Sequence, residues 1–199
     1  MPPSAAAFGL RAHSGWAALV AITGPLDSPS IIDRRILQLC DPKTRGSKQP
    51  YHAAEPLPYK QAEKFVTHCI EQTRNLANKG LRTAIQDLQN SGHRIAACGI
   101  LLGSGRTLPT LNRILASHAL IHAAEGEMFR DALLHAAHHC KLTVKGIKQR
   151  ELHSQAQTTL GRSAEQLEAY LIKQGRTLGP PWREDQKSAT LAAWLALSA

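Results

Sequence analysis

Apolar residues in the first 40 positions fall into three short runs separated by turn residues. The runs are rich in residues suited to strands, while Gly15 and the pair Gly24-Pro25 mark the turns between them. The three predicted strands cover residues 5–12, 16–23 and 30–39. Because short connections join them, we expect an antiparallel meander.

The pattern becomes helical after residue 58. Pro58 suits a helix start, and apolar residues follow at helical spacing to Leu88, with Asn78-Lys79-Gly80 predicting a stop. Residues 94–102 form an apolar run without alternation, which is typical of a strand buried on both faces. Further helices are predicted over 109–140 with a break at Gly126, over 163–174 with Ser163 as cap, and over 185–197, and a short strand is predicted over 141–147.

This order of elements predicts an α/β fold. Three antiparallel strands, followed by parallel strands added through helical crossovers, give a mixed five-stranded sheet with helices on both faces. The length of 199 residues is typical of one domain. We therefore expect residues 1–199 to form a single domain, with a long surface loop at about 41–58.

Composition narrows the choice of partners. Lys and Arg total 24 and Asp and Glu total 15, which gives a net charge of +9. Such an excess favours partners that carry phosphate, although solubility alone also explains it. The four cysteines are far apart without a CxxC pair, which fits a reduced, cytoplasmic setting. No apolar run approaches the roughly 20 residues of a membrane span, so we expect no membrane partner.

Several short segments are similar to those of one protein family. They are Gly9-Leu10-Arg11-Ala12-His13, Ile95-Ala96-Ala97-Cys98-Gly99, the run 144–169 with its turn Gly161-Arg162-Ser163-Ala164, and Asp185-Gln186-Lys187-Ser188-Ala189. In order, these resemble the first strand, the fourth strand, the fifth strand with its helix, and the last helix of the RuvC resolvase branch of the ribonuclease-H-like superfamily. The resemblance implies a ribonuclease-H-like fold. In that superfamily, three or four carboxylates hold two divalent ions around a phosphodiester.

The same resemblance implies that most of these acids are absent. The first-strand acid falls on Arg11, the fourth-strand acid on Cys98, and the two acids of the last helix on Asp185 and Ser188. A guanidinium repels magnesium and can itself pair with Asp185. A shifted register does not restore the site, because the first 26 residues contain no Asp or Glu. We therefore expect neither two-metal nuclease chemistry nor a cofactor.

A second candidate site lies in the helical stretch 109–140. His118 and His122 are four residues apart and Glu125 follows three residues later, so the three share a helix face that can bind zinc or iron. The same stretch holds His135, His138, His139 and Cys140. Such spacings also arise by chance, and solvated histidines on outer helix faces are the alternative that the spacing alone favours.

Two basic segments are candidates for phosphate contacts. One is the loop that contains Lys43, Arg45 and Lys48. The other is the turn Gly103-Ser104-Gly105-Arg106-Thr107, which lies between a predicted strand and a predicted helix, with Arg106 as the charged partner. This turn lacks the Lys-Ser/Thr pair of a P-loop, so a plain strand-to-helix turn stays open as the alternative.

These features predict a catalytically degenerate ribonuclease-H-like domain that binds nucleic acid. One alternative is a metal-dependent nuclease with a shifted site around Asp185, using Glu184 and His or Cys ligands and a divalent metal. The other is a scaffold or assembly protein without a ligand. No pattern in the chain predicts an oligomeric state.

Overall fold

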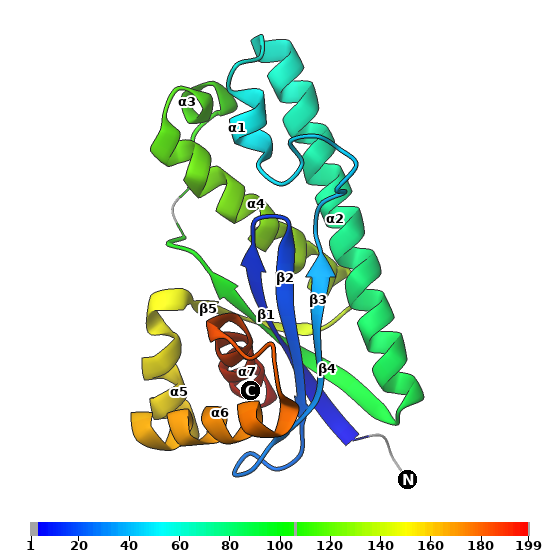
Figure 1. Cartoon of the computed structure of the whole chain (residues 1–199), viewed down its shortest axis with the longest axis vertical. Helices are drawn as coiled ribbons and strands as arrows, with labels where there is room; N and C mark the ends of the chain where they lie inside the picture. Colours follow the sequence, from blue (N-terminus) through cyan, green and yellow to red (C-terminus); the bar gives the residue numbers. More distant parts are fainter. Residues whose placement is uncertain (1–3, 106, 199) are drawn as a thin grey trace.

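Five strands form one mixed sheet in a computed structural model that describes residues 4–105 and 107–198 (Figure 1). The strands are β1 (Ser4–His13), β2 (Trp16–Thr23), β3 (Ser30–Gln38), β4 (His93–Leu102) and β5 (Thr143–Lys148). Their order across the sheet is β3-β2-β1-β4-β5. The first three are antiparallel, and β4 and β5 continue the sheet parallel to β1. The α/β fold predicted from the sequence is thus confirmed.

Helices cover both faces of this sheet (Figure 1). One face carries α2 (Tyr59–Asn90) and α4 (His118–His139), and the other carries α5 (Leu152–Leu160), α6 (Ala164–Leu178) and α7 (Glu184–Leu197). The short helices α1 (Pro50–Ala54) and α3 (Leu111–Leu115) lie beyond the end of the sheet, and the 3-10 turn η1 (Gln149–Glu151) precedes α5. Within the part of the chain that is described, no helix is long and apolar enough to cross a membrane.

The double covering explains why the inner strands are apolar without alternation. On β1, Phe8 and Leu10 point into the core beneath α2 and α4, while Gly9 faces α7. Among the described residues, Trp194 of α7 is the largest fully buried side chain, and it belongs to the second core, on the α7 side of the sheet. Each face of the sheet therefore has its own hydrophobic core.

Helix α7 lies unusually close to the sheet because two glycines make room for it. A side chain at Gly9 would overlap the carbonyl oxygen of Ala189, and one at Gly99 would overlap the carbonyl oxygen of Ala192. Both glycines are neighbours in the register of β1 and β4. This contact fixes where the first turn of α7 lies over the end of β1.

Two helix boundaries differ from the prediction. Helix α2 continues through Gly80. A side chain at Gly80 would press against Leu37 of β3, so this glycine permits close packing of the helix on the sheet and does not end the helix. The break expected at Gly126 lies instead at residues 116–117, between α3 and α4. Gly126 stays helical and packs against the guanidinium of Arg130. Glycine in these places reflects close packing and not a chain break.

The segment expected to be a long surface loop at 41–58 contains helix α1. Pro50 begins this helix, where its missing N–H is not needed. Residues 41–49, which we call the basic loop, form a series of turns before it. Lys43, Arg45 and Lys48 in the basic loop are all exposed.

Candidate functional site

Four side chains meet where β1 ends beneath the first turns of α7. Arg11 Nε lies 3.0 Å from Asp185 Oδ1, and His13 Nε2 lies 2.7 Å from the same oxygen. Arg11 Nη1 also donates to Ser188 Oγ at 2.9 Å. The side chains of Arg11 and Asp185 are only 17% and 19% exposed. We call Arg11, His13, Asp185 and Ser188 the Arg11–Asp185 cluster.

Local structure accounts for this meeting. The alternation of β1 turns Gly9, Arg11 and His13 toward α7. Asp185 lies in the first turn of α7, where the positive end of the helix dipole favours a carboxylate. Ser188 follows three residues later on the same face of the helix. The ion pair between Arg11 and Asp185 that the resemblance implied is therefore present.

The cluster does not fit a centre for two divalent ions. Asp185 forms an ion pair with the Arg11 guanidinium, and Glu184 Oε1 accepts a hydrogen bond from Ser188 Oγ at 3.0 Å. The carboxylates of Asp185 and Glu184 therefore both have protein partners. On β4 the residue next to Arg11 is Leu101, because the preceding residues Leu10 and Ile100 are paired. Leu101 is buried beneath α7. Hard divalent ions require several oxygen ligands, and here a cation and an aliphatic side chain stand in their place.

Cys98 does not join the cluster, and its predicted place at the centre of the site is corrected. In the register of the sheet it is the neighbour of Phe8, and it is fully buried in the core beneath α2 and α4. Burial raises the pKa of its thiol far above the ordinary value. Since side chains alternate along a strand, a one-residue difference in alignment moves a side chain to the opposite face of the sheet.

A pocket of about 360 Å³ adjoins the cluster on the side of the basic loop. His13 stacks on Trp16 across the β1–β2 turn, with ring centroids 4.5 Å apart and planes 6° apart. Trp16 in turn lines the pocket together with Arg45 and Lys48. Two of the four cations predicted to contact phosphate, Arg45 and Lys48, thus line a pocket beside Trp16, and Lys43 lies in the same loop. The fourth, Arg106, falls outside the described residues, and its role stays a prediction.

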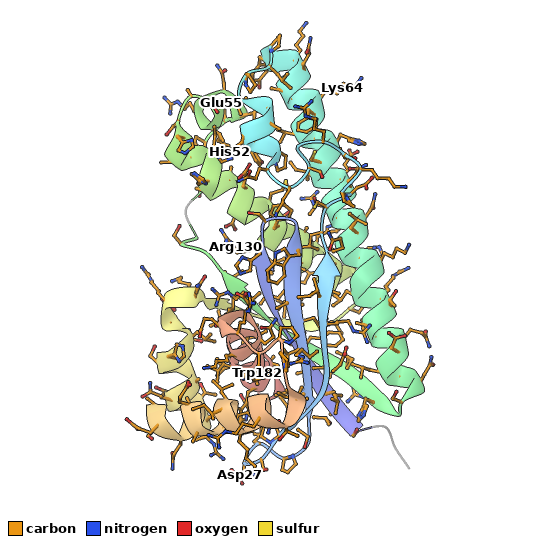
Figure 2. All side chains as sticks on the ribbon, viewed as in Figure 1. Asp27, His52, Glu55, Lys64, Arg130 and Trp182 are labelled. Carbon is orange, nitrogen blue, oxygen red and sulfur yellow. The ribbon has the colours of Figure 1, made fainter. Side chains whose placement is uncertain are left out.

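The histidines predicted as metal ligands lie in a second cluster. The rings of His118 and His122 have centroids 4.5 Å apart, and the ring of His52 lies within 5.1 Å of both. His52 belongs to α1 (Figure 2). Glu125 is buried behind His52, with its Oε1 2.9 Å from His52 Nδ1. We call His52, His118 and His122 the histidine cluster.

Sequence reasoning missed His52 in this cluster. It lies in the segment expected to be a loop, far along the chain from α4, so no local spacing connects it to His118 and His122. The sequence predicted Glu125 as a direct metal ligand, but in the structure its carboxylate contacts His52 instead. Asp185, the other predicted metal ligand, is the partner of Arg11.

Comparison with known proteins identifies the fold. No protein-family model matches the chain, and no curated protein matches its sequence. Its structure is similar to that of T. thermophilus RuvC in complex with a Holliday junction substrate, with a TM-score of 0.52, 9% sequence identity, and coverage of 96% of this chain and 90% of that one. The fold is ribonuclease-H-like, in the RuvC arrangement. A second Thermus thermophilus RuvC structure gives a TM-score of 0.51 at 11% identity, covering 96% of this chain and 92% of the other.

Proposed function

We propose that this chain is a ribonuclease-H-like domain that binds nucleic acid and lacks two-metal nuclease chemistry. The observation that carries the proposal is the ion pair of Arg11 with Asp185. Arg11 stands where the resemblance places the first metal-binding acid of the family. A divalent ion at this place would have to displace a largely buried guanidinium from its carboxylate partner.

The pocket next to the cluster supports the binding part of the proposal. It is lined by the aromatic residue Trp16 and by the cations Arg45 and Lys48. Sites for single-stranded nucleic acid commonly join these two kinds of group, since cations track the phosphates and rings stack on bases. The net charge of +9 adds a general attraction for phosphate. The RuvC structure with a Holliday junction substrate makes a four-way junction the first ligand to test.

A binding titration tests the proposal directly. Labelled four-way junction, duplex and single-stranded DNA are titrated with the protein at roughly 50 and 200 mM salt, and fluorescence anisotropy is measured. We expect binding that weakens with salt, because phosphate contacts release counterions. Absence of binding to all three DNAs at the lower salt concentration would reject the proposal.

A matched pair of variants locates the binding surface. R45Q/K48Q removes two cations from the pocket, and K173Q/R176Q removes two exposed cations from α6. We expect the first variant to bind more weakly and its salt slope to fall by about 1 to 2, since each phosphate contact contributes about 0.7 to 0.9. Equal effects of the two variants would show attraction by net charge alone.

The absence of two-metal chemistry has its own test. The same DNAs are incubated with magnesium or manganese, and cleavage is followed on denaturing gels. We expect intact DNA. Metal-dependent cleavage that Asp185→Asn abolishes would establish a nuclease with a shifted site, while leaving the binding result unaffected.

A further inference from the structure

The histidine cluster brings three potential metal ligands to one place. His118 Nε2 and His122 Nε2 are 3.1 Å apart, and one ligand atom from each of the three histidines lies within 4.8 Å of those of the other two. In a tetrahedral zinc site with Zn–N bonds of about 2.0–2.1 Å, ligand nitrogens are about 3.3 Å apart. A hydrogen bond between His118 and His122 would explain that pair alone. It gives no reason for a third imidazole beside them.

Glu125 supplies the second observation. This carboxylate is 3% exposed, and leaving a buried carboxylate without partners is costly. Its Oε1 accepts the backbone N–H of His52 at 3.2 Å and lies 2.9 Å from the buried His52 Nδ1, although these last two atoms do not align as a hydrogen bond. A carboxylate against one ring nitrogen leaves the other nitrogen for a metal, which is the usual arrangement behind a metal-binding histidine.

We infer that His52, His118 and His122 bind one zinc ion, with Glu125 as the residue that orients His52. Imidazole nitrogens suit zinc, whereas calcium and magnesium require oxygen ligands. His118 and His122 are exposed, so three protein ligands would leave the fourth position open to water. The ion would join α1 to α4. This site shares no residue with the Arg11–Asp185 cluster and does not depend on the proposed function.

Zinc binding is measured on tag-free, metal-stripped protein in the presence of a non-thiol reductant. Calorimetric titration with zinc chloride gives the stoichiometry and the affinity, and cobalt substitution gives an absorption spectrum that reports four-coordination. We expect one zinc per chain. Absence of zinc binding, or cobalt bands of six-coordination, would overturn the inference.

Three variants separate this site from an ordinary pair of histidines on a helix. His52→Ala should weaken zinc binding by at least about 10-fold, and Glu125→Gln should weaken it by about 10- to 100-fold, the range for partners behind a metal ligand. The control is H135A/H139A, which removes another pair four residues apart on α4, with ring centroids 6.3 Å apart. We expect the control to bind zinc like the unchanged protein.

His122→Gln provides a variant without risk to folding, because His122 is exposed. It should lose zinc binding while keeping the circular dichroism spectrum and thermal unfolding of the metal-free protein. If His52→Ala binds zinc as tightly as the unchanged chain, or if the H135A/H139A control abolishes binding, the inference is wrong.

Discussion

The two polar clusters of this molecule use a carboxylate in opposite ways. In the Arg11–Asp185 cluster the carboxylate is at the centre, and Arg11 and His13 contact the same oxygen. In the histidine cluster Glu125 lies behind His52, and the other two rings meet in front of it. The first arrangement neutralises a possible metal ligand, and the second leaves ring nitrogens available. From this difference we expect the histidine cluster, and not the Arg11–Asp185 cluster, to hold an ion.

The largest expected effect comes from separating α7 from the sheet. Gly99→Ala places a methyl group against the backbone of Ala192, which can yield only if α7 moves. We expect the free energy of unfolding to fall by about 3 kcal/mol, the upper part of the range for overpacked cores. Urea denaturation measures this change.

Gly146→Ala is the matched control in another strand of the sheet. Its added methyl group would meet only the side chain of Leu102, with the closest approach to the terminal Cδ1, which can rotate away. We expect a change below about 1 kcal/mol. Zinc affinity should survive in folded Gly99→Ala protein, because α1 and α4 lie apart from α7. Equal destabilisation by the two substitutions would contradict the close contact of α7 with the sheet.

The second effect is stabilisation by zinc. At 100 times its dissociation constant, a ligand that binds only the folded state raises the free energy of unfolding by about 2.7 kcal/mol. We expect the same gain in the unchanged protein and in Arg11→Met, since distant sites contribute additively. Chemical denaturation with and without zinc measures it. A zinc effect that depends on Arg11 would show that the two clusters are coupled.

The third effect is the loss of the ion pair in Arg11→Met. Asp185 would keep His13 as its remaining contact, so we expect a loss of about 2 kcal/mol, less than for a carboxylate left wholly unpaired. Arg74→Met is the control, because Arg74 and Asp131 are 42% and 50% exposed, and its cost should stay below about 1 kcal/mol. Similar losses in the two variants would mean that burial adds nothing to the Arg11–Asp185 pair.

The sequence predicted this fold well because its signals were local. The three opening strands follow from apolar runs between turns, and Ser163 caps the start of α6 as predicted, in a capping box that the structure completes with Gln166. The contact of Arg11 with Asp185 was also within reach, since both lie in segments that resemble one family. These inferences required only neighbours in sequence or the known order of elements.

Two features of the candidate sites were out of reach for physical reasons. His52 meets His118 and His122 only because α1 packs against α4, and that contact has no periodicity in the sequence. The face on which Cys98 lies depends on the register of β4 against β1, where a one-residue shift reverses the side-chain direction. Short motifs locate a strand more readily than they assign its faces.

The smallest effect tests the placement of Cys98 away from Arg11. A nearby guanidinium would favour the thiolate, whereas burial raises the thiol pKa. Burial also raises the pKa of Cys69 to about 11, which lowers its thiolate population about 100-fold from that of an ordinary thiol. Burial raises the pKa of Cys140 as well, but its thiol is partly exposed. At pH 8 we therefore expect iodoacetamide to modify Cys140 first and to modify Cys98 only after unfolding, as followed by mass spectrometry. Fast modification of Cys98 in the folded protein would instead indicate that its side chain lies on the α7 face of the sheet, beside Arg11.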